Sequence, residues 1–177
     1  MYKWKSKRDQ KFPLLIGFVI LIVVLALVFS QSAGFPFSIK FSPEFSTAGF
    51  VEVEPDARVL GEFGVVSLTG GCYSLTANTE AEQAESIFNG LNKIVGVRPG
   101  THDLMKDAFE NLEIKVVMVK IVELRNDTFI GRLILQSGNR VADLDSRLSD
   151  GISIAVRTDA PIYVKEDLMK EQGTYIC

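Results

Sequence analysis

The spacing of hydrophobic and polar positions predicts a chain that alternates between strands and helices. Alternating apolar residues, or short runs rich in Val and Ile, bounded by turn residues, predict strands at 50–54, 65–69, 72–77, 113–124, 128–136, 140–145 and 162–164. Apolar residues three and four positions apart predict helices at 80–92, 101–112 and 166–171, and one that buries Ile152, Ala155 and Val156. This order predicts an α+β fold, in which helices pack on a mostly antiparallel sheet.

Short polar residues mark where three of these helices are expected to begin. Asn78 or Thr79 would cap the first, Thr101 the second, and Ser149 or Ser146 the third. The side-chain oxygen of such a residue accepts a hydrogen bond from a free backbone amide in the first turn. Capping is therefore the simplest explanation of the polar residues at these positions.

One block of the chain, Leu14 to Phe29, contains no charged or polar residue. With its flanks it reaches the roughly 20 residues that a helix needs to cross a bilayer. Residues 1–11 carry five basic residues and one acidic residue, and basic flanks stay in the cytoplasm. We therefore expect a single-pass protein of the cell membrane with a basic cytoplasmic tail, a transmembrane signal anchor, a linker and an extracytoplasmic domain, at 1–11, 12–32, 33–49 and 50–177.

Two other interpretations of the apolar block stay open. A cleaved signal peptide would have the same basic start, and Ser30, Ser32 and Ala33 are small enough for a cleavage site, although no A-x-A motif is present. A buried core helix fits less well, because the block is apolar on every face.

Charge and cysteine content restrict the chemistry of the body. Residues 12–177 hold 14 basic and 21 acidic residues, a net charge of −7, so nucleic acid would need a local basic patch. The single histidine, His102, excludes sites with several histidine ligands. Cys72 and Cys177 could form one bridge outside the cytoplasm, but a frayed free thiol at the terminus is the simpler interpretation.

Two groups of residues carry candidate chemistry, and each has a structural alternative. His102 and Asp103 lie at the start of a helix. In the functional interpretation His102 transfers protons beside a carboxylate. In the structural one, Asp103 only complements the helix dipole. Asp145, Arg147 and Asp150 precede the next apolar helix. There two carboxylates could hold a divalent cation beside a phosphate-binding arginine, or the arginine could pair with an acid at a capped helix start.

Three segments resemble the bifunctional nuclease domain family, and the resemblance spans about residues 50–173. Residues 98–104, R-P-G-T-H-D-L, resemble its R-P-x-T-H-D-L motif, and residues 123–133 resemble a strand–turn–strand with D-x-T-[FY]. Residues 143–164 are similar to D-x-R-P-S-D-A-I-x-L-A-x-[RK]-T-x-A-P-I-[FY]-V. The resemblance implies a compact α+β domain, commonly in a homo-oligomer, with the DNase and RNase activity attributed to plant members. It brings no agreed catalytic mechanism.

The chain departs from the family pattern in three respects. Leu148 stands where the family has Pro, and Gly151 where it has Ala, which costs roughly 1 kcal/mol of helix propensity. The predicted membrane anchor is the third departure, because family members are typically soluble.

Two hypotheses of function follow. In the first, a membrane-anchored nuclease-like domain hydrolyses phosphodiester bonds of DNA or RNA, with a divalent cation such as Mg²⁺ as the candidate cofactor. Catalysis is assigned to His102, Asp103, Asp145, Arg147 and Asp150, substrate binding to Arg147, Ser149 and Arg98, and metal binding to Asp145 and Asp150. In the second, the domain is a non-enzymatic ligand-binding or assembly module, and the same residues form a structural polar network. Both hypotheses expect the two helix starts to meet in space.

Overall fold

The computed structural model describes residues 43–177. The predicted cytoplasmic tail, signal anchor and most of the linker lie outside these residues. Among the helices of residues 43–177, none has the length and apolar character needed to cross a bilayer.

The order of elements predicted from the sequence is confirmed, with one short strand added at the end. The elements are η1 (Pro43–Phe45), β1 (Phe50–Leu60), β2 (Phe63–Gly70), β3 (Tyr73–Glu80), α2 (Ala81–Leu91), α3 (Thr101–Asn111), β4 (Lys115–Arg125), β5 (Thr128–Ser137), β6 (Arg140–Arg147), α4 (Leu148–Thr158), β7 (Ile162–Lys165), α5 (Glu166–Gln172) and β8 (Thr174–Tyr175). The strands form one sheet in the order β6-β5-β4-β7-β1-β2-β3-β8. Only the β4–β7 pair is parallel in this sheet, so the mostly antiparallel prediction is confirmed.

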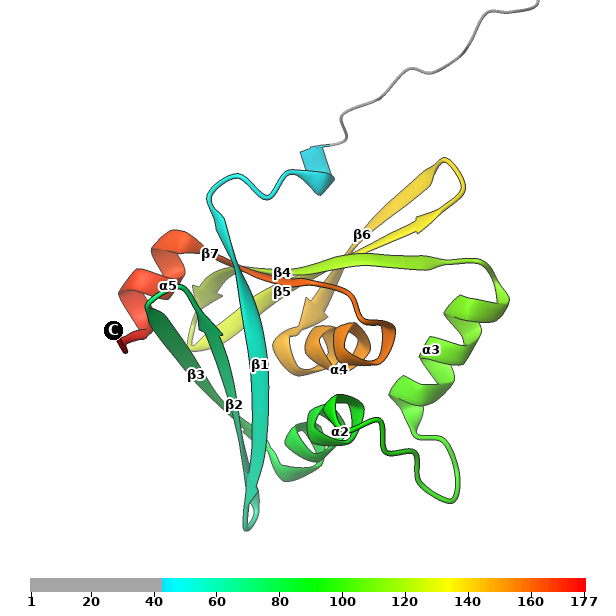
Figure 1. The fold of residues 1–177 in the computed structure, drawn as a ribbon, viewed down its shortest axis with the longest axis horizontal. Coiled ribbons are helices and arrows are strands. Elements are labelled where there is room, and N and C mark those ends of the chain that lie inside the picture. Colours follow the sequence, from blue (N-terminus) through cyan, green and yellow to red (C-terminus); the bar gives the residue numbers. More distant parts are fainter. Residues whose placement is uncertain (1–42) are drawn as a thin grey trace, which may run out of the picture. The chain divides into compact units, whose positions relative to one another are not determined.

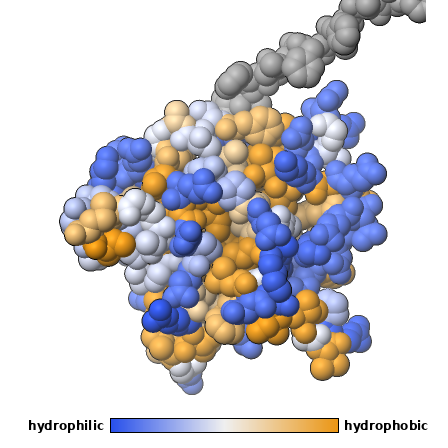
Figure 2. Space-filling model, viewed as in Figure 1, coloured by the Kyte–Doolittle hydropathy of each residue, from blue (hydrophilic) through white to orange (hydrophobic). Residues whose placement is uncertain are grey.

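The sheet curves around α2 and α4, and α3 lies beside them on the side away from β2 and β3 (Figure 1). Of the three predicted inner positions of α4, Ile152 and Ala155 are fully buried, whereas Val156 is only partly buried. The two buried residues belong to one core with Val119 and Ile121 of β4 and Val164 of β7. Hydrophobic side chains also reach the surface between hydrophilic ones (Figure 2). The apolar core thus fixes α4 on the sheet and sets where its N-terminus emerges.

The predicted helix caps are wrong, because the preceding strands run on to the helix itself. Arg147 is the N-cap of α4, and Ser146 is still paired with Gly131 in the β5–β6 ladder. Likewise Glu80 is the N-cap of α2, because β3 remains paired with β2 up to that residue. Helix α3, for which Thr101 was the predicted cap, begins one residue earlier than expected, at Thr101, with Gly100 at its N-cap.

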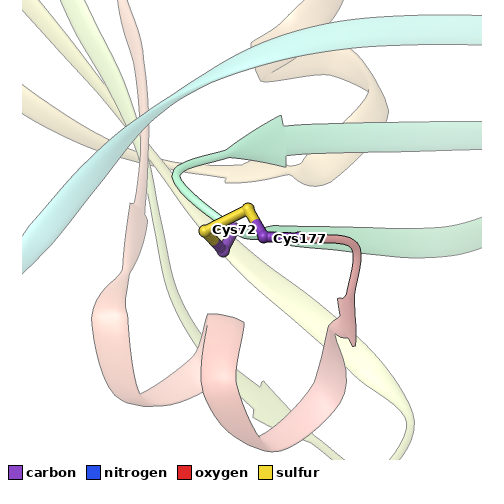
Figure 3. Close-up of a disulfide and its surroundings, with 2 residues drawn as sticks. All are labelled: Cys72 and Cys177. Carbon is purple, nitrogen blue, oxygen red and sulfur yellow. A yellow bond between two sulfur atoms is a disulfide. The ribbon is translucent and has the colours of Figure 1, made fainter.

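The two cysteines form a disulfide, so the expectation of a free terminal thiol is wrong (Figure 3). The bond joins Cys72 in the turn between β2 and β3 to Cys177, across a sequence separation of 105 residues. Strand β8 pairs with β3, and the Ile176 amide donates to the Cys72 carbonyl at 3.0 Å. This pairing places the end of the chain against the β2–β3 turn, which the local sequence does not show.

Candidate functional site

The first turns of α3 and α4 meet, as both hypotheses expected. The Nε2 atom of His102 lies 3.4 Å from Oδ1 of Asp150. Both residues line a cleft of about 490 Å³ whose other wall comes from α2. Their side chains are 17% and 34% exposed, so the pair is accessible from solvent.

A polar chain extends from this pair in both directions. On one side Ser86 of α2 places its Oγ 2.9 Å from Nδ1 of His102. On the other side Arg147 donates from Nε and Nη2 to the two oxygens of Asp150, at 2.7 and 3.1 Å. A two-pronged contact of this kind fixes the plane of the carboxylate. The cleft therefore contains a hydroxyl, an imidazole, a carboxylate and a guanidinium, each hydrogen-bonded or ion-paired to the next.

Burial and charge set the protonation states of the pair. Burial lowers the pKa of His102 below its ordinary value, against the opposing effect of the Asp150 carboxylate. Burial alone would raise the pKa of Asp150, but the hydrogen bonds and charge of Arg147, together with His102, bring it below its ordinary value. At neutral pH the imidazole is therefore neutral beside an ionised carboxylate, which is the state that can accept a proton.

Asp103 has a different environment from Asp150. Its Oδ1 accepts from Nε of Arg157 at 2.6 Å, and its Oδ2 accepts from the Gly100 amide at 2.9 Å. The side chains of Asp103 and Arg157 are only 15% and 7% exposed. Both carboxylate oxygens are thus engaged within the protein, and this geometry is that of a positioning group.

Arg157 connects the three helices of the site. Besides Asp103 of α3, its Nη1 donates to the carbonyls of Ser86 on α2 and Ser153 on α4, at 2.9 and 3.0 Å. A Cβ added to Gly90 would lie 2.6 Å from this Nη1 and 2.5 Å from Cγ2 of Val156. Only glycine therefore leaves room for α2 and the arginine to approach so closely.

The remaining predicted residues are placed unequally. Arg98 is exposed on the cleft and forms no side-chain hydrogen bond or ion pair with the rest of residues 43–177. Ser149 is buried and donates to Oε1 of Gln83 at 3.1 Å, so it does not line the cleft. Asp145 borders a second cavity of about 560 Å³, which His102 and Arg147 also line.

The predicted metal pair does not fit this arrangement. Within residues 43–177, no group of three or more His, Cys, Asp or Glu side chains is arranged to hold a metal ion. Both oxygens of Asp150 already accept from Arg147, whose positive charge would repel a cation coordinated there. We therefore assign no chemical step to a metal at Asp145 and Asp150.

Ser86 and Arg157 were not among the predicted site residues. The signal for Ser86 is a polar stripe on an amphipathic helix, formed with Glu82 and Asn89 at helical spacing. For Arg157 the signal is a long cationic side chain one turn after Ser153 on a strongly apolar helix, which indicates a buried ion pair.

The fold and the cleft define an α+β domain whose polar site is built where helix starts converge. The family model of the bifunctional nuclease domain matches residues 73–176, and the chain belongs to this family. Two similar relatives are the uncharacterized proteins MT1877 and Rv1829 from two strains of Mycobacterium tuberculosis. Each is 38% identical over 79 residues, covering 45% of this chain and 46% of the relative. The match thus spans about half the length of these relatives.

Proposed function

We propose that this protein hydrolyses phosphodiester bonds of DNA or RNA in the cleft between α2, α3 and α4. The observation that carries the proposal is the neutral His102, held between a hydroxyl and an ionised carboxylate in a solvent-open cleft. A group that moves protons to and from reacting oxygens is what phosphodiester hydrolysis requires. Membership of the bifunctional nuclease domain family supports the same chemistry.

Two arginines supply the means of holding a phosphate. The Arg98 guanidinium lies on the cleft and is not engaged by any other residue of 43–177. Arg147 is 67% exposed and keeps N–H groups beyond those that bind Asp150. A guanidinium matches the geometry of phosphate oxygens and stabilises charge that develops on them. Asp150 positions both His102 and Arg147, which ties proton transfer to phosphate binding.

The second cavity can receive the organic part of the substrate. It adjoins the cleft across His102, Arg147 and Asp150, and its far wall is apolar. That wall is formed by Met105, Leu133, Leu144 and Ile154. A base or sugar could pack there while its phosphate faces the arginines.

The charge of the cleft favours short substrates. Glu80, Glu82 and Glu85 line the wall contributed by β3 and α2. Carboxylates repel a polyanion, and phosphate neutralisation supplies most of the affinity for long nucleic acid. We therefore propose oligonucleotides or strand ends, in which one phosphate reaches the arginines, as the substrates of this site.

We also propose that the domain lies outside the cytoplasm, anchored by its N-terminal apolar block. The basic flank of the block supports this orientation. The Cys72–Cys177 disulfide supports it independently, since such bonds persist in oxidising compartments. Self-association is a further proposal. It rests on α3, in which no residue is buried and Leu104 is 64% exposed.

A second candidate is a non-enzymatic module that uses the same residues as a structural network. The observation in its favour is that both oxygens of each carboxylate are engaged within the protein: those of Asp150 by Arg147, and those of Asp103 by Arg157 and the Gly100 amide. In that case substitution of His102 would change stability or ligand binding but not any catalytic rate.

One experiment separates the two functions. The full chain in detergent is incubated with end-labelled DNA and RNA oligonucleotides, with and without EDTA. His102→Ala should lower the rate at least about 100-fold. Arg132→Ala, on β5 away from the cleft, should keep the wild-type rate. If the wild-type rate does not exceed that of His102→Ala, the activity is a contaminant and the nuclease proposal is wrong. An otherwise folded Arg147→Ala protein should show a raised KM.

A further inference from the structure

We propose that Ser86 is the nucleophile of this site, so that hydrolysis proceeds through a covalent phosphoseryl intermediate. The proposal rests on the phosphodiester hydrolase function above and specifies its reaction path. Three side chains from three helices carry it: Ser86 of α2, His102 of α3 and Asp150 of α4.

The arrangement of these groups assigns the histidine tautomer. Asp150 is ionised and can only accept, so the Nε2 atom of His102 that faces it must carry the proton. In the neutral ring the Nδ1 atom then has a free lone pair, which accepts the Oγ–H of Ser86 at 2.9 Å. These are the roles of a nucleophile, a base and an orienting carboxylate, recognised by geometry and not by sequence order. The two ring nitrogens are exchanged relative to serine proteases.

Ser86 also has the surroundings that a nucleophile needs. A serine within a helix usually bonds the carbonyl one turn before it or points to solvent, whereas Ser86 bonds an imidazole on another helix. Its own carbonyl is held by Arg157, which fixes this part of α2 against α4. Ser86 lines the same cleft as Arg98 and Arg147, so the serine and a phosphate bound by either arginine share one solvent-open space.

Neighbouring hydroxyls do not have these properties. Ser149 donates to Gln83 and lies outside the cleft. Ser153 is fully buried, and its hydroxyl has no partner within residues 43–177. Neither contacts a base, so Ser86 is distinguished by its position and not by being a serine.

The reaction has two balanced steps. In the first, Ser86 Oγ attacks phosphorus, its proton passes to Nδ1 of His102, and the bond from phosphorus to the leaving alcohol oxygen breaks. The imidazolium returns that proton to the leaving oxygen. In the second step water attacks the phosphorus of the phosphodiester formed on Ser86, gives a proton to His102, and the phosphorus–Oγ bond breaks. Ser86 regains its proton from the imidazolium, and the product is a phosphate monoester.

The test combines stereochemistry with trapping, on the full chain in detergent. An activated diester with a chiral phosphorothioate group is hydrolysed in heavy-oxygen water. Two displacements give retention of configuration at phosphorus, whereas one displacement by water gives inversion. With bis(p-nitrophenyl) phosphate, acid quenching followed by peptide mass spectrometry should locate a p-nitrophenyl phosphoryl group on Ser86.

Variants complete the test and separate the two proposals. Ser86→Ala should lower the rate about 100-fold or more. Ser153→Ala, the same change on the neighbouring helix, should keep the wild-type rate. Inversion, or a Ser86→Ala enzyme with the wild-type rate, overturns the nucleophile while leaving His102-dependent hydrolysis intact. A wild-type protein no faster than His102→Ala removes the proposed function and the nucleophile together. The stereochemical result needs no variant, so misfolding of Ser86→Ala would not leave the question open.

Discussion

Replacing Arg157 by methionine tests whether the buried ion pair holds the site together. The substitution keeps an unbranched apolar stem close to that of arginine and removes the guanidinium with its charge. It deprives the Asp103 carboxylate of its charged partner and leaves the carbonyls of Ser86 and Ser153 without this donor. Because the side chains of Arg157 and Asp103 are only 7% and 15% exposed, solvent can replace these hydrogen bonds only in part.

The expected loss follows from this burial. Removing one partner of a buried ion pair lowers the free energy of unfolding by about 3–5 kcal/mol. Removing one partner of an exposed pair lowers it by about 0–1 kcal/mol. Arg157→Met should therefore lower the free energy of unfolding by about 3 kcal/mol. Arg132→Met is the matched control, because the Arg132–Asp143 pair is about one third exposed. It should cost at most about 1 kcal/mol.

Chemical denaturation of the full chain, followed by far-UV circular dichroism, measures both values. The pH dependence gives a second check. The hydrogen bond from Arg157 is the main cause that lowers the pKa of Asp103 below its ordinary 3.8. The stability contributed by this shift is complete above pH 3.8 and is lost as pH falls through the lower folded value. The difference between wild type and Arg157→Met should therefore narrow in acid. Equal costs for the two variants, or a gap independent of acid pH, would refute the reasoning.

Three further predictions concern packing, protonation and the disulfide. Gly90→Ala should lower the free energy of unfolding by up to about 2 kcal/mol, as measured by denaturant titration. The added methyl group costs about 1–3 kcal/mol in crowding, which outweighs the gain of about 1 kcal/mol in helix propensity. A stabilised variant would contradict the close approach of α2 and Arg157. If neutral His102 is the base, kcat/KM should fall only below pH 6.5, because burial lowers the pKa of the imidazole. Asp150→Asn should shift this fall to still lower pH, because the carboxylate raises the pKa of the ring. A fall that begins above pH 6.5 would exclude burial as the dominant influence on the pKa of His102. Replacing Cys72 and Cys177 by serine should lower stability by up to about 4 kcal/mol, since the bond closes a loop of about 100 residues. The same melting curve with and without the disulfide would show that the bond does not constrain the unfolded chain.

Hydrophobic periodicity identified the elements well because most of them bury one regular face. It could not fix where strands stop, since residues 78–79 and Ser146 are polar but remain in ladders. The parallel β4–β7 pair joins segments about 40 residues apart, and no local pattern encodes such a pairing. The disulfide was missed for the same reason.

The site was predicted in part because its two helix starts carry chemically distinctive residues. His102, Arg147 and Asp150 were found by residue type and motif, and the structure brings them together. Ser149 was misplaced, because a cap was assumed where the helix had already begun. Ser86 was missed because a serine becomes informative only when its partner in another helix is known.

The absence of buried residues from α3 has a consequence for how activity is lost. Within residues 43–177 this helix is held to the domain largely by its polar contacts and a partly buried Phe109, and not by a deep apolar face. Its amides should exchange with deuterium faster than those of α4, through openings that leave the sheet intact. Each such opening carries His102 away from its partners, so heating should switch the site off before the domain unfolds.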